Sequence, residues 1–161
     1  MSASAAAVEA IFIAAESGQL PHPVAEVEAL SGRGLRGDRK CLGEGTFSDN
    51  AKRGRDLTLI EAEAIEALEA EEGIALEPAA SRRNVLTRGI ALNDLVGERF
   101  RVGEVECIGV ELCEPCSRLE SLTEPGVLRG LVHRGGLRAD ILTGGTITIG
   151  DPVEPLPALA G

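Results

Sequence analysis

Short runs of apolar and β-branched residues, separated by glycine and proline, recur along the whole chain. Such a run with turn residues on both sides is typical of a β-strand. The pattern predicts strands at residues 8–15, 24–30, 84–87, 100–102, 105–112, 138–142 and 146–149. Gly103 and Glu104 predict a hairpin turn between two of these strands, and Gly144 with Gly145 predicts the turn before the last one.

Helical patterns are fewer than strand patterns. Residues 58–61 read TLIE, a capping-box order in which the threonine caps a helix start and the glutamate bonds back to it. We expect the helix that begins there to bury Ile65 and Leu68 and to end at Gly73. One helical turn is predicted at residues 92–95 and a second short helix at residues 125–132.

Many short strands and few helices predict a mainly β fold. We expect a closed or partly closed β-barrel with a few short helices packed outside, and closure removes exposed strand edges. Residues 31–55 are rich in glycine, arginine and polar side chains and predict one long loop. No repeat or linker divides the chain, so we expect one domain at residues 8–153 and a C-terminal tail at residues 154–161.

Composition and charge narrow the range of partners. The 161 residues carry a formal net charge of −10, which opposes binding to nucleic acid or to an anionic membrane. Aromatic residues are 2% of the chain, so few side chains could stack on the bases of a single-stranded nucleic acid. Four cysteines do not make a disulfide scaffold at this length, and the apolar residues 5–15 are too short for a membrane span. We expect a cytoplasmic protein with reduced thiols.

The segment that follows residues 105–112 carries the clearest chemical signal. It reads CEPC at residues 113–116, between a strand and a predicted helix. Pro115 suits the first helical position, which places Cys116 in the first turn. Unpaired N–H groups and the helix dipole favour an anion there, so Cys116 is expected to have a lowered pKa. This predicts a nucleophile or a metal ligand.

Several sequence blocks, taken in order, resemble the MOSC domain, a module named for the C-terminal part of molybdenum cofactor sulfurases. The blocks are GLRGDR at 34–39, TLIE at 58–61, SRRNVLTRG at 81–89, LNDLVG at 92–97, FRVG at 100–103, LCEPC at 112–116, GGTI at 144–147 and GD at 150–151. The resemblance covers most of residues 8–153 and implies a barrel of the pyruvate-kinase-barrel type.

The resemblance also implies a functional site. It assigns sulfur handling or molybdenum ligation to Cys116, as both the catalytic and the metal-binding residue. It matches Arg39 and Arg82 to positions that contact the cofactor phosphate, and Asn84 to the asparagine beside the second arginine. Family members that reduce N-hydroxylated compounds have a Ser-Arg pair before the cysteine, whereas this chain has Glu114 and Pro115.

The implied function is that of a molybdenum-cofactor-binding or sulfur-carrying domain. It would act in oxidoreduction of N-hydroxylated compounds or in sulfur transfer, so its ligand would be a small-molecule cofactor or substrate. Its protein partner would be an electron-transfer protein or a sulfur donor. The family is also associated with pyridoxal phosphate. A thiolate is a suitable protein ligand for molybdenum, and arginine suits a phosphate.

Two other functions remain open at this level. Cys113 and Cys116 resemble the redox pair of a thiol–disulfide oxidoreductase. Alternatively, the pair is half of a zinc site in a non-enzymatic interaction module, with the other half drawn from Cys41, Cys107, His22 or His133. Cys113 itself is interpreted as a resolving thiol, a second ligand or a packing residue.

Overall fold

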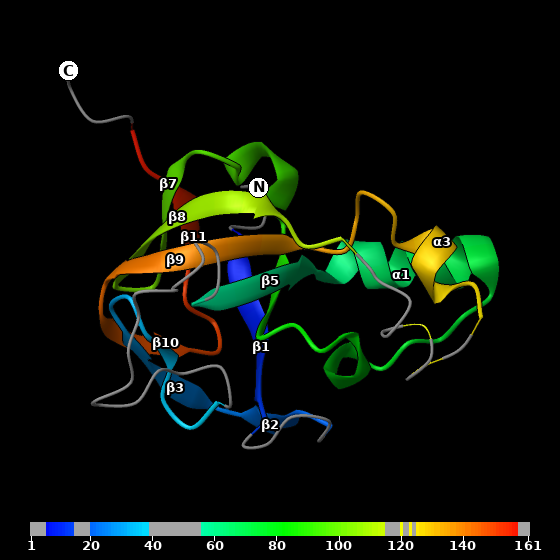
Figure 1. The fold of residues 1–161 in the computed structure, drawn as a ribbon, viewed down its shortest axis with the longest axis horizontal. Coiled ribbons are helices and arrows are strands. Elements are labelled where there is room, and N and C mark those ends of the chain that lie inside the picture. The colour runs from blue at the N-terminus through cyan, green and yellow to red at the C-terminus, as the bar shows by residue number, and fades with distance from the viewer. Residues whose placement is uncertain are drawn as a thin grey trace, which may run out of the picture.

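The computed structural model describes residues 6–14, 20–38, 56–114, 120, 123 and 125–157, which form a mainly β structure (Figure 1). Its strands are β1 (Ala7–Ile13), β2 (His22–Val24), β3 (Glu26–Leu30), β4 (Gly34–Leu35), β5 (Leu57–Glu61), β6 (Val85–Arg88), β7 (Arg99–Val102), β8 (Val105–Leu112), β9 (Leu137–Thr143), β10 (Gly145–Thr148) and β11 (Val153–Pro155). Its helices are α1 (Ala62–Glu72) and α3 (Val127–Gly130), with short 3-10 segments η1 (Pro78–Ser81) and η2 (Leu92–Leu95).

The described strands pair into two sheets. The larger sheet has eight strands in the order β11-β7-β8-β9-β5-β6-β1-β2, and the smaller has three in the order β10-β3-β4. The larger sheet is mixed, because β5 and β6 are parallel whereas its other ladders are antiparallel. The predicted mainly β class is therefore confirmed.

The predicted closed barrel is not established by this pairing, since β11 and β2 are the outer strands of the larger sheet. An isolated bridge joins Ala7 of β1 to Pro152, just before β11. Val8 N–H donates to Asp151 O at 2.9 Å, and Val153 N–H donates to Ala6 O at 3.0 Å. The larger sheet thus curls until its β11 side touches β1, but the contact is a short bridge rather than a ladder between two strands.

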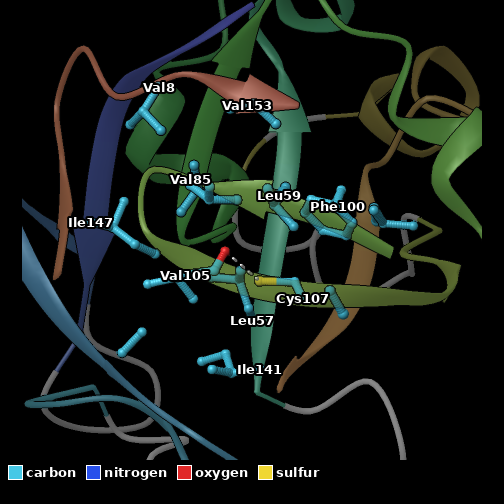
Figure 2. Packing of buried hydrophobic residues seen from close by; sticks show 14 of the residues in the cluster. Val8, Leu57, Leu59, Val85, Phe100, Val105, Cys107, Ile141, Ile147 and Val153 are labelled. Carbon is cyan, nitrogen blue, oxygen red and sulfur yellow. Dashed lines mark hydrogen bonds between the residues drawn. The ribbon is translucent and has the colours of Figure 1, made fainter. Parts of the chain in front are cut away.

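Both faces of the larger sheet are covered, because residues along a strand alternate between two apolar clusters. On β5, Leu57 and Leu59 belong to the cluster inside the curl, whereas Ile60 belongs to the cluster that packs with the helices. Figure 2 shows the first cluster, where Leu59, Val85 and Phe100 converge from three strands. Helices α1 and α3 therefore lie outside the curled sheet, as the sequence predicts, whereas Leu92 and Leu95 of η2 belong to the inner cluster.

Residues 57–61 are the main difference from the predicted secondary structure. The capping-box interpretation of Thr58 and Glu61 is wrong, because β5 runs through Glu61 and α1 begins at Ala62, with no side-chain cap bond. β5 pairs with β9 on one side and with β6 on the other, and Thr58 is buried. Pairing on both sides satisfies the backbone groups of these residues, so tertiary context favours a strand over the local helix signal.

The predicted turns have different outcomes in space. The β7–β8 hairpin is confirmed, with Gly103 at a φ of 60° in its turn. The turn after β9 does not make a hairpin, because β10 pairs with β3 and carries the chain into the smaller sheet. β11 continues to Pro155, so the last strand extends beyond residue 153.

The carboxyl ends of β5 and β8 lie on the same side of the larger sheet. They run in the same direction because each is antiparallel to β9. Figure 1 shows α1 and α3 beyond the arrowhead of β5, in contact with each other. The chain enters its cysteine motif from this end of β8.

None of the helices in the described ranges has the length and apolar character needed to cross a membrane.

Candidate functional site

The chain leaves β8 at Cys113 and Glu114, the first two residues of the cysteine motif. Cys113 N–H donates to Gly136 O at 2.7 Å, which extends the β8–β9 ladder by one pair beyond Leu112. The Cys113 side chain is 3% exposed, and its thiol is free. The motif therefore starts from a backbone that is bonded into the sheet, with its first thiol buried.

Arg83 holds the carbonyl groups of this exit. Its Nη2 donates to Cys113 O at 2.9 Å and to Glu114 O at 3.5 Å. Its Nε donates to Gly135 O at 2.7 Å, and its Nη1 donates to Ser81 O at 3.2 Å. The planar guanidinium thus connects three segments: the last residue of η1, the residues before β9 and the residues after β8.

Glu114 is also held through its side chain. Its carboxylate accepts the backbone N–H of His133 at 2.7 Å and lies 2.8 Å from His133 Nδ1. His133 has a left-handed backbone with a φ of 62°, and its carbonyl accepts the Asn93 side chain at 2.9 Å. The exit from β8 is consequently bonded to the turn that follows α3 as well as to Arg83.

Arg82 and Asn84 flank Arg83 but lie in different surroundings. Arg82 is partly buried at the end of η1, with a left-handed φ of 65°. Asn84 is buried, and its side-chain oxygen accepts the Thr58 N–H at 3.2 Å and the Thr58 hydroxyl at 3.1 Å. Its amide nitrogen donates to Phe12 O at 3.2 Å. Asn84 therefore joins β1, β5 and the start of β6, and one amide hydrogen remains for any other contact.

The other predicted site residues fall outside this geometry. Cys116 and Arg39 lie outside the described residues, as does Cys41. The structure therefore places Arg82 and Asn84 next to Arg83, and places Arg83 on the first two residues of the motif that contains Cys116.

Cys107 is a buried thiol of a different kind, because it faces the inside of the curled sheet (Figure 2). Burial, together with the nearby carboxylates of Asp56, Glu106 and Asp140, raises its pKa to about 12. Burial also raises the pKa of Asp56, against the hydrogen bond that Asp56 accepts from Ile141 N–H. A neutral thiol in this position is a core residue and not a nucleophile.

This burial predicts a pH-dependent loss of stability that depends on Cys107. An unfolded chain releases the thiol proton near pH 9.0, whereas the folded protein keeps it until about pH 12. The unfolded state binds fewer protons across this window, so the free energy of unfolding falls as pH rises through it. Urea unfolding at several pH values should show a shallower fall in Cys107→Ala than in the parent. Equal slopes in the two proteins would contradict the assignment.

The acidic residue at the end of β5 is bonded within the fold. Glu61 accepts Leu92 N–H at 2.9 Å, and burial raises its pKa while this bond opposes the shift.

Across the part of the chain that the structure describes, no three His, Cys, Asp or Glu side chains form a group that would hold a metal ion. Nothing in these residues therefore supports the zinc-site interpretation.

The sequence interpretation missed Arg83 and Glu114 as residues that organise the site. Arg83 was part of the SRRN block at residues 81–84, but the resemblance assigned the phosphate role to its neighbour. Adjacent side chains point in different directions, and Arg82 adopts a left-handed φ that a sequence does not reveal. The usable signal was the pair of adjacent arginines ahead of a buried strand.

The fold is a curled mixed sheet with short outer helices, and the cysteine motif follows the end of β8. The sequence model of the MOSC domain family matches residues 45–154. The chain therefore belongs to the MOSC domain family, which is linked to functions of the molybdenum cofactor sulfurase type. Among curated proteins, no sequence matches this chain.

Solved structures share this fold at low sequence identity. The YuaD protein from Bacillus subtilis has a TM-score of 0.78 and 16% identity, over 94% of this chain and 96% of YuaD. YiiM from Geobacillus stearothermophilus has a TM-score of 0.70 and 15% identity, over 94% of this chain and 75% of YiiM. YiiM from Escherichia coli has a TM-score of 0.64 and 17% identity, over 96% of this chain and 71% of that one. At this level of identity, the likeness concerns the fold.

Proposed function

We propose that this protein binds the molybdenum cofactor, or carries sulfur for it, through the Cys116 thiolate. One observation carries the proposal: the Arg83 guanidinium is bonded to Cys113 O at 2.9 Å. This bond brings the arginine segment at residues 81–84 against the cysteine motif, although about thirty residues separate them in the chain. In this proposal, the metal ligand and the phosphate-binding cation would come from these two neighbouring segments.

The donor set fits such a cofactor chemically. Cys116 would supply the soft sulfur ligand that molybdenum takes, and Arg82 with Arg39 would hold the phosphate. Asn84 would contribute its remaining amide hydrogen, since its other polar atoms are bonded to Thr58 and Phe12. When bound, the cofactor would supply a redox-active metal centre, and the protein would supply the thiolate and the cationic contacts.

Sulfur transfer uses the same residue in a different step. The Cys116 thiolate attacks the outer sulfur of a donor persulfide, a new S–S bond forms, and the donor leaves as a thiolate. A reducing cytoplasm suits both versions, because it keeps Cys116 as a thiol. The barrel architecture expected for the family belongs to the same proposal, and the bonds between residues 6–8 and 150–153 support it.

Cys116→Ser is expected to remove most of the molybdenum and sulfane sulfur that copurify with the full chain. A hydroxyl is a harder and less acidic ligand than a thiol, and it cannot form a persulfide. The measurement is elemental analysis for molybdenum and zinc together with cyanide-released sulfur. The protein is purified from cells that make the cofactor, and Cys41→Ser is the matched control.

The outcomes separate the assignments. Parent protein that holds neither molybdenum nor sulfane sulfur would overturn the proposed function. Retention of both in Cys116→Ser would keep the function but remove Cys116 from it. Stoichiometric zinc in place of molybdenum would favour the interaction-module interpretation.

A further inference from the structure

We propose that Arg83 is the positioning residue of the site, because it fixes the backbone from which the cysteine motif departs. This inference rests on the proposed function for its chemical purpose. The geometric part of the inference does not depend on the proposed function, because all of the contacts that it uses join described residues. The family resemblance assigned the cofactor contacts to the residues on either side of Arg83 and gave Arg83 no role.

The contacts of Arg83 use the shape of the guanidinium. Three of its nitrogens donate to four carbonyl oxygens, on Gly135, Ser81, Cys113 and Glu114, at 2.7–3.5 Å. Guanidinium donors are fixed in one plane, so bonding several carbonyls at once sets the distances between the segments that carry them. A lysine ammonium presents its three donors from a single point and cannot span the same set of acceptors.

These contacts complete the hydrogen bonding where the sheet ends. Cys113 N–H still has a partner on β9, in Gly136 O, but Cys113 O points away from that ladder to Arg83. β8 ends at Leu112, so the carbonyls of Cys113 and Glu114 lie beyond the strand and are bonded by a side chain. Arg83 supplies those bonds on one side, and His133 holds the Glu114 carboxylate on the other. Arg83 therefore fixes the backbone carbonyls of the last two described residues before Cys116.

The test compares variants that separate the shape of Arg83 from its charge. Arg83→Lys keeps the charge and loses the fork, whereas Arg83→Met loses both. If Arg83 positions the motif, both variants behave alike. Each loses about 10- to 100-fold in molybdenum retention, the range typical of residues that orient a metal ligand. If only the charge matters, Arg83→Lys retains the parent behaviour, and the proposal is wrong.

A second measurement needs no cofactor. In a Cys41→Ser background the remaining cysteines are Cys116 and the two buried thiols, Cys107 and Cys113. We expect both Arg83 variants to change the rate of Cys116 alkylation by iodoacetamide to the same extent. Because the rate is measured on cofactor-free protein, it still tests Arg83 if the chain proves to bind no molybdenum.

Arg99→Lys is the matched control. Arg99 is another partly buried arginine, bonded through Nε to Glu106 at 2.8 Å near the start of β8. The Arg99→Lys substitution should lower the stability of the protein without changing the alkylation rate of Cys116 or the retention of molybdenum. An equal effect of Arg99→Lys on both readouts would reduce Arg83 to a general stabilising residue. Arg83→Gln, a neutral residue with two amide hydrogens, replaces Arg83→Met if the latter does not fold.

Discussion

Gly136→Ala is expected to lower the free energy of unfolding by more than about 4 kcal/mol, a loss that few single substitutions cause. A Cβ at this position would lie 2.0 Å from the backbone oxygen of Leu59 on β5. The φ of 115° is itself unfavourable for any residue with a side chain. Because the contact is with backbone, the new methyl group forces β5 and the start of β9 apart.

The separation would also reach the candidate site. Gly136 O accepts the Cys113 N–H, and Gly135 O accepts Arg83 Nε. Displacing this segment therefore disturbs two of the bonds around the end of β8. We expect little folded protein at moderate temperature, with a melting temperature lower by about 10 °C or more. Circular dichroism and urea unfolding measure the loss.

Gly73→Ala is the control for the backbone contribution. Gly73 ends α1 with a φ of 73°, and no atom lies within 4 Å of the position of its Cβ. It shares the positive φ but not the close contact, so its expected cost is about 1 kcal/mol. Equal losses in the two variants would contradict the close approach of β5 to the start of β9.

Asn84→Ala is expected to lower the free energy of unfolding by about 3 kcal/mol, since it leaves several buried groups without their partner. The carboxamide of Asn84 accepts the N–H and the hydroxyl of Thr58 and donates to Phe12 O. All of these bonds are buried, where a missing partner is not replaced by water. Thermal or urea unfolding of the purified variant tests this value.

Asn93→Ala is the matched control for Asn84→Ala. Asn93 is exposed and donates one bond, to His133 O at 2.9 Å, so the expected cost is below about 1 kcal/mol. A cost for Asn84→Ala as small as this would show that its buried bonds contribute little. The comparison matters for the site as well. Cofactor lost in Asn84→Ala reflects a removed contact only if the variant remains folded under the assay conditions.

Local patterns predicted the parts of the fold that depend on local interactions. The alternation and turn residues at 100–112 gave the β7–β8 hairpin, and the helical turn expected at residues 92–95 is η2. The family resemblance, carried by ordered blocks, is confirmed by the match over residues 45–154. The hairpin and the helical turn depend on residues that are close in sequence, and the family resemblance depends on the order of sequence blocks along the chain.

Features that depend on distant segments were not accessible in this way. Thr58 lies in a strand because β6 and β9 pair with it from both sides, and neither neighbour is visible in the sequence around residue 58. β10 joins β3 for a similar reason, since its partner lies more than a hundred residues earlier. The role of Arg83 depends on which of two adjacent arginines reaches the end of β8, and this is a property of the assembled sheet.

The bonds that join residues 6–8 to residues 150–153 have a consequence for synthesis on the ribosome. β1 cannot complete its pairing until Val153 has been translated and has cleared the exit tunnel. Until then, one side of the curled sheet is open, and its apolar interior is incompletely enclosed. Contacts between residues so far apart in sequence slow folding, because the intervening chain must be ordered first. The nascent protein is therefore exposed to chaperones and to aggregation until residues 150–153 have emerged.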